Sequence, residues 1–507
     1  MKKLQKNTKI KENKWLFFFV ITILLIICLI FNKEFDIDLW YLLSEGKYIF
    51  QNGIYHVDPL SMHSGLEIVV QNWLSATLFY VIYNLFGQIG ILTMILITFF
   101  FICLLLYKIC MLISEQNYFL SLITTFMTSL FLTFFFIVSR PQILSYVVLL
   151  SLIYVLELYI KTENKKYLVW IPILSLIEIN MHASLWWMIF LFSLPYIIDS
   201  FNCPALKLQG YKKKPLIIAL IIAFLVGFIN PYGYKAITFI FSSYGDKFMH
   251  LYINELLPFN IRGDVINIQM FFLFIIIGLI YIFFREGKIR IRYLCLFCGT
   301  LLLGFMSIKG FSNFILVAIF PLAYFFKDIF PKNILNFISA EKSKKIFQIG
   351  TIFLTIVFIG LFIIKINTNL MENKAESSMK IISEVFEPQS AKIYSSFNNG
   401  GYVEFMGYKP YIVPRAEVFL KKNNKKEDLF KEFYQLQNNT LNIEKFLKKY
   451  EFDALLIDNN DFLYTKLHSI ESYTLIHKEN DFKVYIKSEL LKKEEFNKYN
   501  KIYEFIS

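Results

Sequence analysis

The chain has 507 residues, of which 56% are hydrophobic and 18% charged, with a formal net charge of +13 and a mean hydropathy of +0.51. Soluble domains carry about 45–50% apolar residues, so this composition excludes an ordinary soluble protein and indicates an α-helical polytopic membrane protein. The basic excess does not predict a nucleic-acid partner, because lysines and arginines cluster between hydrophobic runs without interleaved aromatic residues.

Eleven hydrophobic runs are predicted to cross the membrane. The first and the last of them carry no internal charge over roughly the 17–25 residues that a spanning helix needs. The predicted spans are residues 15–31, 90–113, 118–138, 142–160, 167–181, 183–198, 215–229, 266–284, 291–308, 312–326 and 346–365.

Basic segments between the runs predict the orientation. Lysine and arginine are enriched in cytoplasmic loops, which places the segments at 1–14, 161–166, 207–214, 285–292 and 341–345 inside the cell. The basic N-terminus (1–14) is then cytoplasmic and the C-terminus extracytoplasmic in a multi-pass protein of the cell membrane. A twelfth apolar run lies at 72–87. If it also crossed the membrane, the number of crossings would no longer fit this orientation, so we predict an interfacial or re-entrant helix there.

The composition changes after Lys365, which predicts a membrane domain (15–365) followed by a soluble α/β domain (366–507). Alternating residues predict strands at 391–397, 408–414, 452–458 and 482–487, and amphipathic patterns predict helices at 426–437, 442–450 and 461–470. "NNGGYVEF" is interpreted as a turn into a strand. It lacks the glycine spacing of a nucleotide-binding loop.

Polar residues gather in the predicted outer loops. The first outer loop, 32–89, carries Asp36, Asp38, Trp40, His56 and Asp58. Four short outer connections, 137–142, 178–184, 229–235 and 307–313, carry Arg140, His182, Asn230 and Lys309. Each residue taken singly fits a helix cap or an interfacial anchor equally well. Because ionisable groups at membrane depth usually face a cavity, their occurrence on one face favours a site.

The order of these motifs resembles bacterial multi-spanning proteins of the GT-C class, related to protein mannosyltransferases and aminoarabinose transferases. The residues that carry the resemblance are Asp36, Asp38, Leu39, Trp40, Gly46, Gly53, Asp58, Pro59, Ser61, Trp73 and Leu74, followed by "SRPQ", "NMHAS", "NPYG", "INELLPFN", "GGYVEF" and "PRAEVF". The chain departs from the pattern at Leu42, where members often have His, at Asn72, where they often have an acid, and at 413–415, where "VPR" replaces Asp-Gly-Arg.

The resemblance implies a GT-C-like membrane domain and an inverting glycosyltransferase. Such an enzyme takes a sugar from a polyprenyl-phosphate carrier at the outer face and passes it to a cell-surface glycan or another envelope acceptor. It implies a catalytic acid at Asp36 or Asp38, between which the sequence does not choose. The departures are compatible with a divergent acceptor, an altered mechanism or lost activity.

The residue chemistry fits that reaction. A carboxylate can take the proton of an acceptor hydroxyl, which typically contributes about 10²–10⁴-fold. A phosphate leaving group needs cations, for which Arg140 and Lys309 are candidates. The other candidate substrate-binding residues are Trp40, His56, Asp58, His182 and Asn230. No cofactor is required, although Asp-x-Asp also fits a divalent metal ion.

Two other functions remain open from the sequence. A lipid or glycan transporter or flippase would carry paired acids or broken helices near mid-membrane, whereas most charges here lie at span boundaries. A non-catalytic envelope-assembly scaffold would recruit envelope-assembly proteins through residues 366–507. A polysaccharide polymerase fits less well, because it would place its large outer loops in the middle of the chain.

Overall fold

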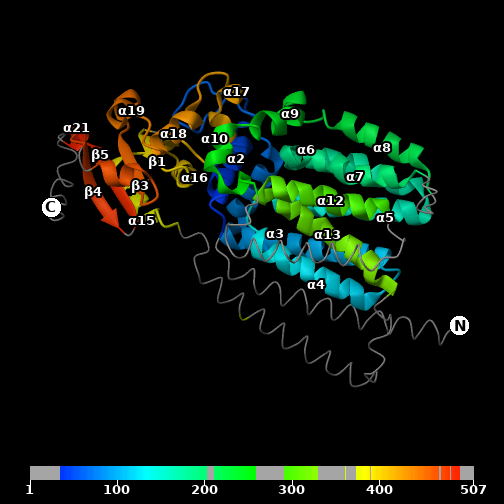
Figure 1. Ribbon diagram of the computed structural model, residues 1–507. Coiled ribbons are helices and arrows are strands. Elements are labelled where there is room, and N and C mark those ends of the chain that lie inside the picture. The colour runs from blue at the N-terminus through cyan, green and yellow to red at the C-terminus, as the bar shows by residue number, and fades with distance from the viewer. Residues whose placement is uncertain are drawn as a thin grey trace. The chain divides into compact units, whose positions relative to one another are not determined.

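The computed structural model describes residues 35–201, 210–258, 290–328, 360, 373–388, 390–467, 470–479 and 481–491 (Figure 1). The chain divides into two compact units, which we describe separately. The helical unit comprises Met1–Glu34, Leu92–Ile237 and Ile253–Asn369, and the sheet unit comprises Phe35–Ile91, Thr238–Tyr252 and Leu370–Ser507.

The described part of the helical unit is built from long apolar helices. They are α3 from Leu92 onward (Trp73–Ile113), α4 (Tyr118–Phe135), α5 (Gln142–Thr162), α6 (Trp170–Met181), α7 (Trp187–Asp199), α8 (Lys213–Val226), α12 (Ile291–Met306) and α13 (Phe311–Phe325). Short 3₁₀ turns at Lys165–Val169, Ala183–Leu185, Asn254–Leu256, Ile308–Gly310 and Phe326–Asp328 connect or extend them. α6 packs against both α5 and α8, and α12 packs against α7 and α13 (Figure 1).

These helices cover the predicted spans from 90–113 to 215–229, together with 291–308 and 312–326. The predicted spans 15–31 and 266–284 lie outside the described residues, as does 346–365 apart from Gly360. Within the described ranges, Trp73–Ile113 and Gln142–Thr162 are long and apolar enough to cross a membrane by length and composition, and the other apolar helices are shorter. The number of spans therefore stays a prediction.

The predicted separation of 72–87 from the following span corresponds to a break in α3. Gly87 has φ 60° and ψ −152°, so two helical segments meet at a kink there. A positive φ of this kind is accessible to glycine without a steric penalty, which explains how one continuous apolar stretch can change direction at this residue.

The outer surface of α8 is strongly apolar. Ile218 is 57% exposed and Leu225 59% exposed, with further exposed residues at Ile221 and Phe228. Soluble monomers rarely expose contiguous apolar patches of more than a few hundred Å². This helix therefore presents the kind of surface that a lipid bilayer covers.

The sheet unit contains a five-stranded sheet in the order β2-β1-β3-β5-β4. Its strands are β1 (Lys392–Ser395), β2 (Lys409–Pro410), β3 (Ala454–Asp458), β4 (Tyr473–Glu479) and β5 (Phe482–Lys487). β1 pairs in parallel with β2 and β3, whereas β5 is antiparallel to β3 and β4. Four of these strands fall on the predicted ones, and β4 was not predicted.

Helices accompany the sheet in the same unit. They are α2 (Asp38–Asn52), α10 (Lys247–Tyr252), α15 (Glu376–Val385), α16 (Gly400–Phe405), α17 (Lys421–Asn424), α18 (Leu429–Gln437), α19 (Ile443–Tyr450), α20 (Leu463–Lys466) and α21 (Ser488–Leu491), and α9 (Tyr234–Ser243) leads into it. α18 and α19 match the predicted helices, and α20 covers part of the third.

The prediction that "NNGGYVEF" turns into a strand is wrong, because Gly400–Phe405 forms helix α16. The two glycines at the start of α16 allow other segments of the chain to approach its backbone closely. A Cβ on Gly400 would lie 1.9 Å from the carbonyl oxygen of Ile412, and one on Gly401 would lie 3.2 Å from the backbone nitrogen of Tyr41 in α2. Gly401 thus allows α16 to pack directly on α2, and Gly400 allows it to pack on the backbone of Ile412, so α2 and the C-terminal sequence share one core.

Candidate functional site

The helical unit brings Arg140 and Glu255 together. Arg140 lies in the turn before α5, and its Nη1 donates to both carboxylate oxygens of Glu255, at 2.7 and 2.9 Å. Burial alone would raise the pKa of Glu255, but the charges of Arg140 and Lys309 hold that pKa below its ordinary value. Two cations therefore act on the Glu255 carboxylate.

His182 lies beside the same group of residues. It follows the last residue of α6, is buried, and its Nδ1 lies 3.2 Å from the Ser145 hydroxyl of α5. Lys309, in the turn between α12 and α13, acts electrostatically on both His182 and Glu255. The structure therefore gathers three of the predicted residues, Arg140, His182 and Lys309, within the helical unit.

Hydrogen bonds link the four predicted outer connections in two pairs. Gln142 donates to Ser312 at 2.9 Å, which joins 137–142 to 307–313. Asn180 donates to the carbonyl oxygen of Ile229 at 3.0 Å, which joins 178–184 to 229–235. The charge of Lys309, which acts on His182, relates one pair to the other.

Asn230 has a local conformational role in this arrangement. Its Nδ2 donates to the carbonyl oxygens of Gly227 and Gly233, and its Oδ1 accepts from the backbone amide of Tyr232. Asparagine side chains commonly stabilise turns through such bonds to nearby backbone groups. Asn230 therefore shapes the turn that follows α8.

The other predicted residues lie in the sheet unit. Asp36 precedes α2, and its Oδ1 accepts the backbone amide of Asp38 at 3.0 Å. Asp38 is the first residue of α2, and both carboxyl groups are partly exposed. Asp38 thus lies in the first turn of α2, and Asp36 lies just before the helix.

Trp40 and His56 differ in their surroundings. The Trp40 ring is 9% exposed and packs against the rings of Tyr402 and Phe405 in α16, with centroids 4.7 and 4.9 Å away. His56 is exposed, and its carbonyl oxygen accepts the amide of Ile68. The indole therefore packs α2 against α16, whereas the imidazole lies at the surface.

Asp58 belongs to a buried ionic cluster centred on Arg415. The guanidinium lies 3.1 Å from Glu45, 3.5 Å from Asp58 and 2.7 Å from Glu404. Burial raises the pKa of Glu45 to about 7 and that of Glu404 to about 8, because Arg415 opposes the desolvation of each only in part. Three carboxyl groups share a single cation here, so the cluster retains protons near neutral pH.

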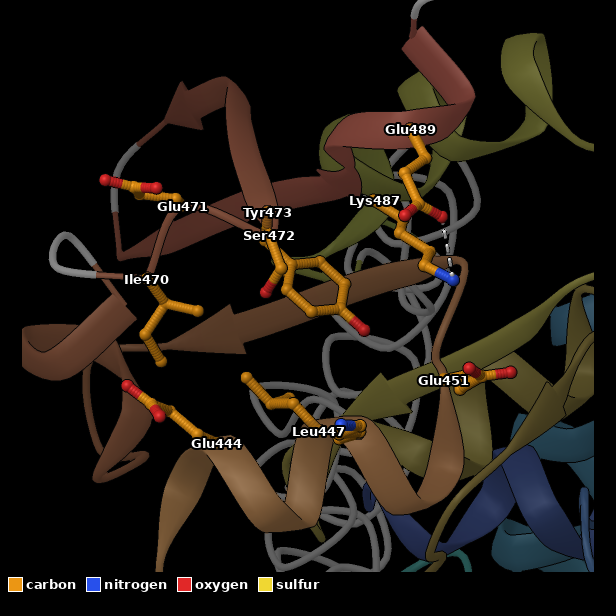
Figure 2. A pocket seen from close by; sticks show the side chains of 10 residues that line it. Glu444, Leu447, Glu451, Ile470, Glu471, Ser472, Tyr473, Lys487 and Glu489 are labelled. Carbon is orange, nitrogen blue, oxygen red and sulfur yellow. Dashed lines mark ion pairs between the residues drawn. The ribbon is translucent and has the colours of Figure 1, made fainter.

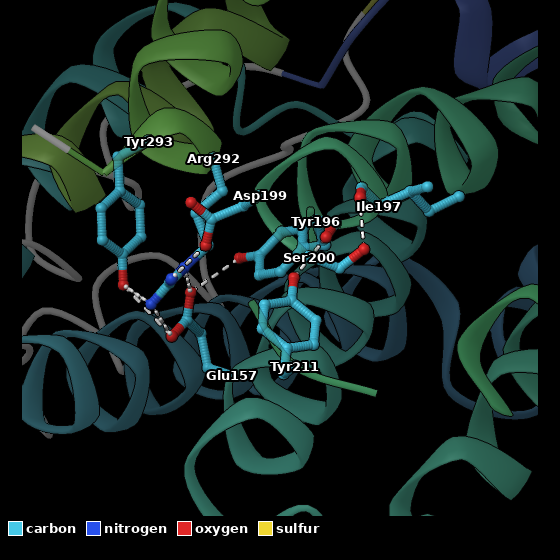
Figure 3. Close-up of polar contacts among 8 residues, drawn as sticks. All are labelled: Glu157, Tyr196, Ile197, Asp199, Ser200, Tyr211, Arg292 and Tyr293. Atoms are coloured by element: carbon cyan, nitrogen blue, oxygen red, sulfur yellow. Dashed lines mark hydrogen bonds and ion pairs between the residues drawn. The ribbon is translucent and has the colours of Figure 1, made fainter. Parts of the chain in front are cut away.

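A second ionic cluster lies in the helical unit (Figure 3). Arg292 of α12 donates to Asp199 at 2.7 Å and to Glu157 at 3.1 Å, and Tyr196 donates to Glu157 at 2.9 Å. Tyr293 donates to Glu157 as well. These buried bonds join α5, α7 and α12, so their role is to hold the three helices together.

A surface cavity of about 630 Å³ lies in the sheet unit between α19 and the strands β4 and β5 (Figure 2). Lys487 pairs with Glu489 at 3.3 Å, and the Tyr473 hydroxyl donates to the carbonyl oxygen of Phe452. The lining residues are Glu444, Leu447, Lys448, Glu451, Ile470, Glu471, Ser472, Tyr473, Lys487 and Glu489. The cavity is a solvent-facing hollow of mixed charge.

The ranges that the structure describes contain no group of three or more His, Cys, Asp or Glu side chains able to hold a metal ion. Several residues of the two clusters were not predicted. Glu45 pairs with Arg415 across 370 residues of sequence, and outside the clusters Glu255 pairs with Arg140 across 115 residues, which no local pattern indicates. Glu178 could have been singled out, since it is an acid inside the apolar run "IPILSLIEINM".

Comparison with solved structures shows which fold the chain has. It superposes on the archaeal oligosaccharyltransferase AglB from Archaeoglobus fulgidus, in complex with an inhibitory peptide and a dolichol-phosphate, with a TM-score of 0.58 and 11% identity over 88% of this chain and 70% of that one. Another structure of the A. fulgidus oligosaccharyltransferase, tethered with an acceptor peptide containing the NVT sequon, gives a TM-score of 0.52 and 13% identity over 88% and 69%.

A further solved structure aligns over nearly the whole of both chains. ArnT from Cupriavidus metallidurans, bound to undecaprenyl phosphate, gives a TM-score of 0.52 and 10% identity over 94% of this chain and 98% of that one. No protein-family model matches the sequence, and a comparison with curated proteins finds no match. The resemblance to the GT-C class that the sequence motifs indicated is therefore confirmed at the level of the fold: this chain has the fold of these glycosyltransferases.

Proposed function

We propose that this chain is a membrane glycosyltransferase. It transfers a sugar from a polyprenyl-phosphate carrier, with inversion, to a cell-surface glycan or another envelope acceptor at the outer face of the cell membrane. In this proposal the protein is multi-pass, with a cytoplasmic N-terminus and an extracytoplasmic C-terminal domain. The observation that carries it is the fold shared, over 94% of the chain, with a protein solved in complex with undecaprenyl phosphate.

The cations of the helical unit supply what a phosphate leaving group requires. A departing lipid phosphate carries negative charge and needs hydrogen-bond donors and positive charge rather than protonation. The planar guanidinium of Arg140 can donate two parallel hydrogen bonds, and the ammonium group of Lys309 carries a localised positive charge. Buried His182 lies beside these residues. We assign these three residues to the phosphate of the lipid donor.

The acids of the first outer loop supply the remaining chemistry. Glycosyl transfer passes through a cationic sugar ring, which a carboxylate stabilises, and a carboxylate can also deprotonate the acceptor hydroxyl. Asp36 and Asp38 are the candidates, and exposed His56 can hydrogen-bond to acceptor hydroxyls. Because Trp40 and Asp58 are buried against the C-terminal sequence, we assign them to positioning α2. Asn230 shapes its own turn.

The proposal is tested with the purified full-length protein in detergent. A panel of radiolabelled polyprenyl-phosphate sugars is offered to the wild type, Asp36→Asn, Asp38→Asn and Arg140→Ala, with and without chelator, and sugar transfer and lipid binding are both measured. Lys166→Ala, which removes an exposed charge, is the control. We expect one aspartate variant to lose about 10²–10⁴-fold in turnover while retaining lipid binding.

The outcomes separate the alternatives. Lipid binding and turnover in the wild type, lost selectively in one aspartate variant, would identify the catalytic base. Lipid binding without turnover, combined with movement of the lipid between leaflets in vesicles, would favour a flippase. If the wild type binds none of the polyprenyl-phosphate sugars, the glycosyltransferase proposal fails, and a scaffold that acts through residues 366–507 becomes the better explanation.

A further inference from the structure

Glu178 is an unusual carboxyl group in the helical unit. It lies in the last turns of α6 and is fully buried, with 0% of its surface exposed. Neither of its oxygens has a hydrogen-bond partner of ordinary geometry among the residues that the structure describes. Burying an ionised carboxylate without a paired cation is very costly, so such a group normally takes up a proton instead. A buried acid of this kind requires a functional or structural reason.

The position of Glu178 relative to His182 suggests that reason. The backbone amide of His182 donates to the carbonyl oxygen of Glu178 at 2.8 Å. His182 directly follows α6 as its capping residue, so the acid and the imidazole lie within about one helical turn of each other. Ser145 of α5 faces both of them: its hydroxyl is 3.2 Å from Nδ1 of His182, and it is the polar side chain beside the Glu178 carboxyl group.

We propose that protonated Glu178 is a positioning residue, which acts through Ser145 to hold His182 in a single tautomer. With Glu178 protonated, a rotation of its carboxyl group lets the O–H donate to the neighbouring Ser145 hydroxyl oxygen, and the Ser145 hydroxyl in turn donates to Nδ1 of His182. Since Nδ1 then accepts a hydrogen bond, the ring proton of neutral His182 resides on Nε2. The tautomer of a histidine is commonly set by the hydrogen bond that its other ring nitrogen makes.

This arrangement has a consequence for the ligand. A neutral imidazole whose Nε2 carries the proton is a hydrogen-bond donor, and it adjoins the cationic Lys309. A donor placed among cations suits a phosphate oxygen of an anionic lipid headgroup. This part of the inference rests on the proposed function, because the lipid phosphate is the donor substrate of that reaction. The order of the hydrogen bonds itself concerns only Glu178, Ser145 and His182.

The hydrogen-bond order can be read by ¹⁵N NMR of the full-length protein labelled at its six histidines. The His182 signals are assigned by their loss in His182→Asn. We expect the wild type to show an unprotonated Nδ1 and a protonated Nε2. Glu178→Gln should preserve this pattern, because its amide N–H can donate to Ser145. Glu178→Leu and Ser145→Ala should both give a mixture of tautomers, and Glu163→Gln, an exposed acid, should change nothing.

Kinetics then connect the tautomer to the substrate. With a polyprenyl-phosphate sugar that the wild type uses, Glu178→Leu and Ser145→Ala should raise KM for the donor about twofold, because roughly half of an evenly mixed population lacks the Nε2 donor, and change kcat less. Glu178→Gln should rescue the KM. A merely structural role for Glu178 would lower the folded yield or kcat without altering the Nδ1 and Nε2 signals.

Distinct results overturn distinct claims. A protonated Nδ1 in the wild type would mean that Ser145 donates to an ionised Glu178, and would refute the inference. Unchanged His182 signals in Ser145→Ala would also refute it. The Ser145→Ala variant keeps the inference testable if Glu178→Leu does not fold. The expected NMR pattern in a wild type that turns over no lipid-linked sugar would instead refute the proposed function and leave the hydrogen-bond order standing.

Discussion

Arg415 and Glu45 are 370 residues apart in the sequence, yet their side chains meet at 3.1 Å in the core of the sheet unit. Both are almost completely buried, and the same guanidinium also binds Glu404 and faces Asp58. The segment from α2 to Asp58 and the C-terminal sequence are thus joined by charge as well as by the packing of α2 on α16. We therefore expect the C-terminal sequence to depend on this segment for its stability.

Arg415→Met should destabilise the protein by about 3–5 kcal/mol, because removing one partner of a buried ion pair leaves the others buried and uncompensated. The measurement is the free energy or midpoint of unfolding of the full-length protein in detergent. Lys380→Ala, which removes an exposed pair with Glu376, should have little effect. Equal stability of Arg415→Met and the wild type would show that the cluster does not hold the loop.

Stability should depend on pH through Glu45 and Glu404. Their pKa values in the folded protein, about 7 and about 8, lie above the ordinary value of 4.5. Between pH 4.5 and 8 the folded state therefore binds more protons than the unfolded state, so stability should fall as the pH rises through this window and level off above it. Glu404→Gln removes one of the two groups and should flatten the decline, as unfolding at several pH values would show. A rise in stability across the same window would contradict the assignment.

Gly400→Ala should destabilise the sheet unit by about 1–3 kcal/mol, the usual range for overpacking. The added Cβ would lie 1.9 Å from the carbonyl oxygen of Ile412, which is backbone and cannot move aside cheaply. Gly299→Ala is the matched control, since nothing lies within 4 Å of its Cβ position in α12. Comparable thermal midpoints for the two variants would show that α16 tolerates a side chain here.

Arg140→Ala should weaken binding of polyprenyl phosphate by about 10–100-fold, the equivalent of roughly 1.5–3 kcal/mol for a hydrogen bond to a charged group. Arg140→Lys should recover only part of the affinity, because lysine keeps the positive charge but cannot donate the paired hydrogen bonds of a guanidinium. Glu255→Gln removes the protein partner of Arg140 and should leave binding intact. If Glu255→Gln and Arg140→Ala weaken binding equally, the ion pair is structural and Arg140 does not contact the lipid.

The agreement between prediction and structure varies with the kind of pattern. The apolar runs of α3 to α8 identify their helices, because long apolar runs are typical of helices in a membrane protein. β1, β3 and β5 lie where strands were predicted, although their residues are nearly all buried and do not alternate between buried and exposed. "NNGGYVEF" misled, because Gly-Gly commonly marks a turn, whereas here it permits close approach of α16 to α2. β4 was missed because charged and exposed residues end "YTLIHKE" at the edge of the sheet.

By itself the sequence determined that this is a membrane protein with a distinct C-terminal α/β segment, since composition and hydrophobic periodicity are local properties. It also identified Arg140, His182 and Lys309 as residues to consider together. Only the tertiary structure decided the partners of the predicted residues: Glu255 for Arg140, Ser145 for His182, and Arg415 for Asp58. Ion pairs and hydrogen bonds between distant segments produce no periodic pattern in the sequence, because they depend on how the helices and the sheet pack.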